Sequence, residues 1–84
     1  MVQFVLTPEQ CRAGRALVGW SQDDLAAAAK VAKRTIADFE LGRRSTYDRT
    51  LRDLREAMEN EGAIFLADGE TAPGGPGVRL RAKP

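Results

Sequence analysis

The stretch Gly19–Arg44, GWSQDDLAAAAKVAKRTIADFELGRR, constrains the fold most, because it holds two short helical patterns with only a few residues between them. The first pattern starts after Ser21, a residue suited to cap a helix, and continues with acidic residues that suit the positive end of its dipole. Small residues at Ala26 and Ala29 allow a neighbouring helix to approach closely. A second helix follows over Lys33–Leu41. Two short helices joined by so tight a turn predict a helix-turn-helix.

The second of these helices has an inner and an outer side. Ile36 and Phe39 are spaced to face a core, and Gly42 is a suitable C-terminal stop. The first turn is polar and basic, and long donors placed there reach base edges when a helix lies in the major groove. The side chains expected to stand exposed on that turn are Lys33, Arg34 and Thr35.

Helical patterns also flank this pair. Before it, Thr7 can cap a helix, Pro8 fits the first helical position and Gln10 completes a capping box. After it, a helix over Asp48–Asn60 has apolar residues at the 3–4 spacing, and Gly62 ends it.

The period then changes from helical to alternating. Short strands are predicted at Ala63–Leu66 and Val78–Arg81, with a turn-rich segment between them. The N-terminal residues 2–6, VQFVL, also have strand character, so a small sheet could form from either end or from both. The predicted architecture is mainly α: a four-helix helix-turn-helix domain over residues 1–62, with a C-terminal β-hairpin extension over 63–84 that is not an independent domain.

Composition excludes several classes of protein. With 84 residues the core is small, so a dimer or a tightly packed helical cluster is expected to supply the stability. The sequence has no histidine and only one cysteine, and it lacks a Gly-rich phosphate loop after a strand. We therefore expect no enzyme, no metal and no cofactor. A lone thiol at Cys11 fits a buried core position in a reducing cytoplasm, and no apolar run is long enough to span a membrane.

The charge is unevenly distributed, although the net charge is only +1. Residues 30–55 hold eight Lys or Arg against four Asp or Glu, whereas the segments on either side are net acidic. The positive charge is thus concentrated around the second helix of the pair, as an electrostatic footprint for nucleic acid requires.

The segment RALVGWSQDDLAAAAKVAKRTIADFELGRR resembles the helix-turn-helix of the XRE family, the phage-repressor-like bacterial regulators, over roughly Gln10 to Met58. The matching pattern is an Arg, then WSQ, LA, V, TI and FE-x-G-x-R. The C-terminal GAIFLADGETAPGGPGVRLR is similar to the strand extension of many short proteobacterial members.

The resemblance implies a role for each matching position. Gln22 would contact a phosphate and buttress a side chain that reads a base. Arg15 and Glu40 match an ion pair between the first and third helices. The positions implied in base reading are Lys33, Arg34 and Asp38, and the cations implied at phosphate are Arg43 and, as a helper, Arg44.

The sequence also departs from the family pattern. Lys30 stands where glycine is usual in the turn, so it is expected to need a positive φ. Ala32 replaces the hydroxyl residue that usually caps the recognition helix. The missing cap should lower the stability of that helix by about 1 kcal/mol. Leu41 replaces a polar residue often used for backbone contact.

These observations predict a small transcriptional regulator that binds double-stranded operator DNA as a homodimer. An alternative from another class is a protein-binding antiactivator that masks a transcriptional activator, favoured by the low net charge, the missing cap at Ala32 and acidic Asp38. An antitoxin that binds both DNA and a protein is a third reading.

Overall fold

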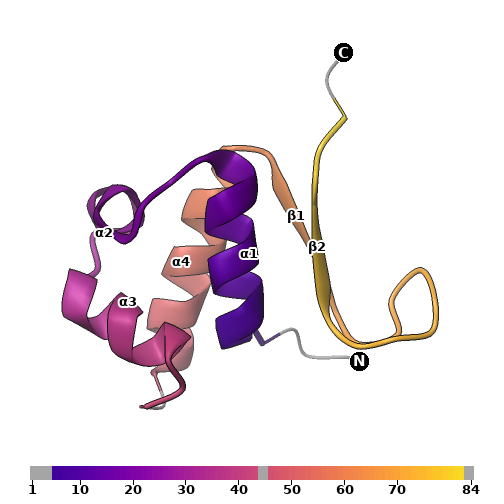
Figure 1. Ribbon diagram of the computed structural model, residues 1–84, viewed down its shortest axis with the longest axis horizontal. Helices are drawn as coiled ribbons and strands as arrows, with labels where there is room; N and C mark the ends of the chain where they lie inside the picture. The colour runs from indigo at the N-terminus through magenta and orange to yellow at the C-terminus, as the bar shows by residue number, and fades with distance from the viewer. Residues whose placement is uncertain (1–4, 44–45, 83–84) are drawn as a thin grey trace.

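The computed structural model describes residues 5–43 and 46–82 of the chain. Four helices precede an antiparallel hairpin of two strands, which confirms the predicted architecture (Figure 1). The elements are α1 (Pro8–Val18), α2 (Gln22–Ala29), α3 (Lys33–Glu40), α4 (Asp48–Asn60), β1 (Ala63–Leu66) and β2 (Gly77–Leu80).

The first two helices begin where local hydrogen bonds fix them. The Thr7 hydroxyl accepts from the Gln10 amide at 3.0 Å, and the Gln10 side chain accepts from the Thr7 amide at 3.1 Å. Ser21 and Asp24 form the same reciprocal arrangement at the start of α2. Each box supplies acceptors for backbone donors that the helix itself leaves unbonded, so both predicted starts are confirmed.

Three helices end in a left-handed residue. Gly19 has φ 74° after α1, Lys30 has φ 58° after α2 and Gly42 has φ 71° after α3. The amide that follows each of these residues bonds back to the carbonyl five positions earlier; Val31, for example, donates to Ala26 at 3.2 Å. The expected positive φ at Lys30 is therefore confirmed, and it is adopted without the glycine that makes this conformation easy.

Two predicted boundaries were wrong by one residue. Helix α3 ends at Glu40 and not at Leu41, which is the C-cap residue, with φ −85° and ψ −5°. Strand β2 covers Gly77–Leu80 and not 78–81, because Gly77 faces Leu66 in the register of the hairpin. The small sheet, which could have formed from either end of the chain, contains the two C-terminal strands. Residues 5–7 form no strand and Leu6 is buried in the core, while residues 2–4 of the N-terminal segment lie outside the described residues.

The core lies between the four helices. Leu25, Ile36 and Leu54 are fully buried and Phe39 is nearly so, which confirms the inward face predicted for Ile36 and Phe39. Trp20 is partly buried and packs against this cluster. Within the described residues, none of the helices has the length and apolar character needed to cross a membrane.

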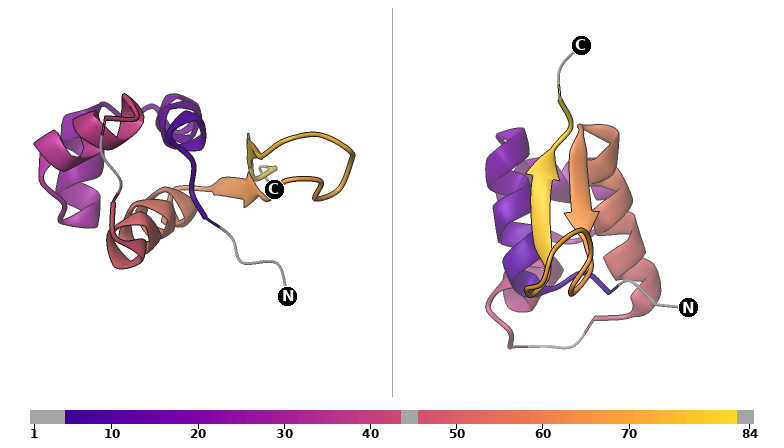
Figure 2. Two further views of the ribbon diagram at one scale, coloured as in Figure 1. Left: turned by 90° about the horizontal axis from the view of Figure 1, so that it is seen from below. Right: turned by 90° about the vertical axis from the view of Figure 1, so that its right-hand side faces the viewer.

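The hairpin packs on α1 and α4 as a second layer. In Figure 2, β2 runs over α1 and β1 runs over α4. Phe65 turns inward against Gly14 of α1, where an added Cβ would lie only 2.9 Å from its ring. The Gln10 amide group donates to the carbonyls of Leu66 (2.9 Å) and Gly77 (2.8 Å), where the two strands meet the loop. The hairpin therefore shares the core of the helical domain.

Candidate nucleic-acid interface

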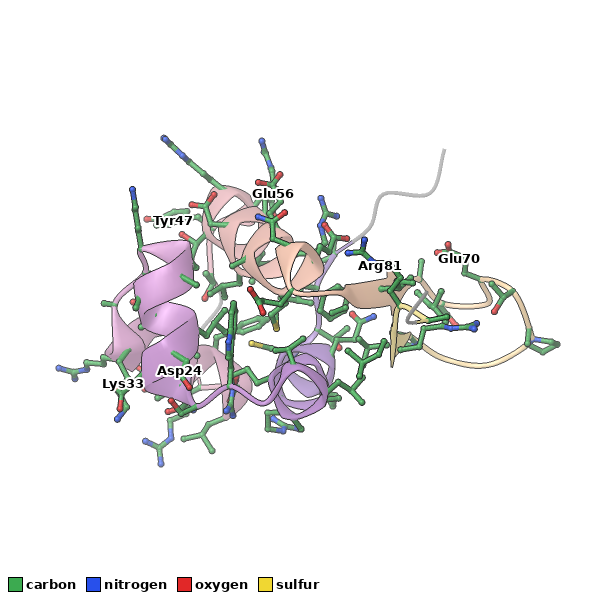
Figure 3. The ribbon with its side chains drawn as sticks, turned by 90° about the horizontal axis from the view of Figure 1, so that it is seen from above. Asp24, Lys33, Tyr47, Glu56, Glu70 and Arg81 are labelled. Atoms are coloured by element: carbon green, nitrogen blue, oxygen red, sulfur yellow. The ribbon has the colours of Figure 1, made fainter. Side chains whose placement is uncertain are left out.

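Helix α3 lies at the opposite end of the molecule from the hairpin (Figure 1). Lys33 and Arg34 on its first turn are exposed, as predicted. Figure 3 shows Lys33 pointing outward from this end. Thr35, which was predicted to be exposed, is half-buried, and so is Asp38. The most accessible part of the helix is therefore the basic pair at its N-terminus.

Lys33 also contacts the preceding helix. Its Nζ lies 3.3 Å from Asp23 Oδ2, and the two side chains are 56% and 72% exposed. An ion pair this exposed contributes at most about 1 kcal/mol, because water and salt screen it. Lys33 can therefore leave Asp23 for another anion at little cost.

The N-terminus of α3 has no side-chain cap. Ala32 has the extended backbone of an N-cap residue (φ −61°, ψ 137°) but no oxygen to offer to the first amides. These amides and the helix dipole together favour an external anion. The missing cap, expected from the sequence, is confirmed.

A tight C-terminal turn places Arg43 just beyond α3. The Arg43 amide donates to the carbonyl of Asp38 at 3.0 Å, and the Gly42 amide donates to Phe39 at 3.0 Å. The Arg43 side chain is exposed, and beside it Leu41 is 64% exposed. Arg44, the second cation expected here, lies outside the described residues.

A buried carboxylate anchors the C-terminal end of α3. Glu40 is 2% exposed and accepts two hydrogen bonds from Arg15 of α1, at 2.7 and 2.8 Å. It also accepts from the Gln22 amide at 3.1 Å and from the Cys11 thiol at 3.0 Å. Arg12 donates to the Glu40 backbone carbonyl. The ion pair between Arg15 and Glu40, implied by the family resemblance, is therefore present.

These contacts decide the ionisation of the two buried groups. Burial alone would raise the pKa of Glu40, but hydrogen bonds from Arg15, Cys11 and Gln22 outweigh it, so the pKa lies below its ordinary value of 4.5. Burial, together with the hydrogen bond to Glu40, raises the pKa of the Cys11 thiol well above its ordinary value. The thiol therefore stays protonated and acts as a hydrogen-bond donor in the core, as expected of a structural cysteine.

The structure joins some of the predicted site residues and separates others. Gln22 is half-buried and is linked through Glu40 to the C-terminal end of α3. Lys33 and Arg34 lie at the N-terminal end of that helix. Sequence reasoning missed Arg12, which binds the C-terminal end of α3. The sequence feature that could have pointed to Arg12 is its position three residues before Arg15, which places the two side chains on the same side of the helix. Within 5–43 and 46–82, no cluster of three or more His, Cys, Asp or Glu is arranged to hold a metal ion.

This geometry defines a class of protein: a helix-turn-helix DNA-binding domain. Helices α2 and α3 form the helix-turn-helix, and side chains of α1 and α2 hold α3 in place. A family model described as "Helix-turn-helix" matches residues 12–61, well over half of the chain. The protein belongs to this family, of the XRE type, which is a family of DNA-binding domains and not of enzymes. A comparison with curated proteins gave no significant match.

Proposed function

We propose that this protein is a transcriptional regulator that reads the major groove of an operator with α3. The observation that supports this most strongly is the contrast between the two ends of that helix. Lys33 and Arg34 are exposed at its N-terminal end, while Glu40 is fixed at the other end by Arg15 and Gln22. A recognition helix must hold its base-reading donors in one orientation, which such an anchor provides.

Phosphate contacts near the C-terminal end of α3 complete the proposal. Gln22 uses its side-chain nitrogen to reach Glu40, and an amide nitrogen carries a second hydrogen that can be donated to a phosphate. Arg43 lies just beyond the C-terminal end of the helix, and Arg44 follows it in sequence. Thr35 and Asp38, half-buried on the same helix, would contribute to base selection.

The proposed active form is a homodimer in which each subunit contributes one DNA-binding domain. Residues 1–62 form the DNA-binding unit in this proposal, and 63–84 form an extension that depends on it for its core contacts. Two subunits related by a two-fold axis would bind two half-sites about one helical turn apart, or a multiple of that distance.

Salt dependence tests the proposal. If Lys33, Arg34, Arg43 and Arg44 each displace one condensed counterion from the DNA in both subunits, log affinity falls against log salt with a slope of about −7. Affinity for an operator fragment then drops by about four decades between roughly 50 and 200 mM salt. The measurement is fluorescence anisotropy on DNA flanking the gene, with a shuffled duplex as control. Absence of sequence-selective binding at low salt contradicts the proposal.

A second candidate function is an antiactivator that uses the same face to bind a protein. The observation that favours it is Leu41, which is 64% exposed beside Arg43 at the end of α3. Apolar burial is not screened by ions, so capture of an activator protein through Leu41 would persist at high salt. An antitoxin would show both behaviours: steep salt dependence with DNA and shallow dependence with its protein partner.

A further inference from the structure

Within residues 5–43 and 46–82, β2 pairs with β1 alone, so its other edge is open and the backbone groups there are directed outward. The Arg81 amide donates to the carbonyl of Gly62 at 2.7 Å, which marks these facing residues as a hydrogen-bonded pair. Such pairs alternate along an antiparallel ladder, and Arg79 opposite Ile64 is the next one. The residues between them, Val78 and Leu80, therefore aim their amide and carbonyl groups away from β1. An incoming strand would find its backbone partners at these two residues.

The position of this edge leaves it accessible while α3 contacts DNA. The hairpin and α3 lie at opposite ends of the molecule (Figure 1). Strand β2 runs along α1 in the same direction, held at its start by the bond from Gln10 to Gly77 at 2.8 Å (Figure 2). Its far end therefore lies beside the C-terminal half of α1.

The side chains along the edge alternate in character. Leu80 lies on the inner side of the hairpin, facing the register position of buried Ala63, yet it remains 44% exposed. Leu17, in the C-terminal half of α1, is 39% exposed. Arg79 and Arg81 are exposed on the outer side, and the Arg81 guanidinium donates a long hydrogen bond of 3.4 Å to the carbonyl of Glu59. The edge thus offers cations on one side and apolar surface on the other.

A second copy of β2 is a poor occupant of this edge. A two-fold antiparallel pairing centred on Arg79 places that residue opposite its own symmetry mate, and one centred on Leu80 places Arg79 opposite Arg81. Like charges directly opposite each other destabilise a strand pair. A pairing centred on Val78 brings Pro76, which has no amide hydrogen, opposite Leu80.

We infer that the open edge of β2 binds an extended segment of another protein in which acidic and apolar residues alternate. The segment adds a third strand, with backbone hydrogen bonds to Val78 and Leu80. Its acidic residues lie opposite Arg79 and Arg81, and the apolar residue between them packs towards Leu80 and Leu17. This inference rests on the hairpin and not on DNA binding, so each can fail without the other.

The test uses the full chain and synthetic peptides of about eight residues with blocked ends. One peptide alternates valine and glutamate, and the control alternates valine and lysine. We expect the glutamate peptide to bind and to shift the amide resonances of Val78 and Leu80 in a ¹⁵N-correlation spectrum, leaving those of Lys33 and Arg34 unchanged. Equal binding of both peptides, no binding at millimolar peptide, or shifts confined to other surfaces would overturn the inference.

Charge reversal provides the second arm. The double variant Arg79→Glu, Arg81→Glu should lose about tenfold or more in affinity for the glutamate peptide and should bind the lysine peptide instead. The matched control is Arg49→Glu, Arg52→Glu, which makes the same charge change on the exposed face of α4. Equal losses of peptide affinity in both double variants would show a general effect of charge. That result would overturn the assignment of the binding site to the edge of β2.

Leu80→Pro tests the backbone bonds. The Leu80 amide points away from β1, so proline there removes an edge donor without removing a hydrogen bond of the hairpin. Peptide binding should fall while the thermal midpoint changes little. If this variant unfolds, the same bond is removed from the peptide side by N-methylating the peptide at the position facing Leu80. Unchanged binding in either form contradicts strand addition, as does concentration-dependent self-association through Val78 and Leu80 without peptide.

Discussion

Arg15 and Glu40 join α1 to α3 through two charge-assisted hydrogen bonds of 2.7 and 2.8 Å. Bonds of this kind are stronger than neutral ones and fix direction as well as distance. Because Glu40 also accepts from Gln22 of α2, one carboxylate sets the position of α3 relative to both preceding helices. The proposed DNA-binding face is therefore supported from inside the domain.

Removing the charge of Glu40 should cost stability in a pH-dependent way. Glu40→Gln leaves Arg15 without its counter-ion, and we expect a loss of about 3 kcal/mol at neutral pH. The pKa of Glu40 is lower in the folded protein than its ordinary 4.5, so its contribution is complete above that value and is lost as the pH falls through the folded pKa.

The measurement is urea unfolding of both proteins between about pH 7 and pH 3. The difference in the free energy of unfolding between the two proteins should shrink as the pH is lowered. The pKa of Asp24 is also lowered, by its backbone hydrogen bond from Ser21, but that effect is common to both proteins and cancels in the difference. A gap that stays constant with pH would show that charge is not what Glu40 contributes.

The double variant Lys33→Ala, Arg34→Ala should separate binding from folding. Both side chains are exposed and Lys33 makes only a solvent-exposed ion pair, so the thermal midpoint should stay within a few degrees. Binding to the operator, or to a protein partner of this face, should be lost. The matched control is Arg79→Ala, Arg81→Ala, which removes the same charge from the hairpin and should keep DNA binding. Retained binding by the α3 variant would mean that these residues do not carry the function.

Supplying the missing cap should stabilise α3. Ala32→Ser places a hydroxyl at a residue that already has N-cap geometry, and we expect a gain of about 1 kcal/mol. Calorimetry should show this as a midpoint raised by about 4–8 °C. The reverse change, Ser21→Ala, removes an observed cap of α2 and should lower the midpoint by a similar amount. No gain from serine would indicate that the first amides of α3 are already satisfied in solution.

The contact between α1 and the hairpin can be tested at Gly14. A Cβ there would lie 2.9 Å from the Phe65 ring and 3.0 Å from the Met58 sulfur, so Gly14→Ala should destabilise the protein by about 1–3 kcal/mol. Hydrogen exchange should accelerate first in β1 and β2. Gly75→Ala, where the added Cβ meets nothing within 4 Å, is the control and should be close to neutral. A neutral Gly14→Ala would mean that the hairpin does not pack on α1 as described.

Local features of the sequence predicted the elements well. The capping boxes at Thr7 and Ser21 and the stop at Gly42 depend on neighbours within a few residues, and all three are present. The small errors at Leu41 and at the start of β2 fall at element ends. There, helical bonds fray and strand limits depend on a partner that is distant in sequence.

The tertiary structure decided what distant residues do together. The sequence by itself determined four helices, a hairpin and a basic turn at Lys33 and Arg34, because periodicity, caps and turn residues act over short separations. Only the folded chain shows that the Gln10 side chain donates to the carbonyl of Leu66, more than fifty residues away, and that the Cys11 thiol donates to Glu40. It also shows that, among the described residues, β2 pairs on one edge alone. These contacts join residues whose spacing in the sequence carries no period, so they arise only when packing brings the elements together.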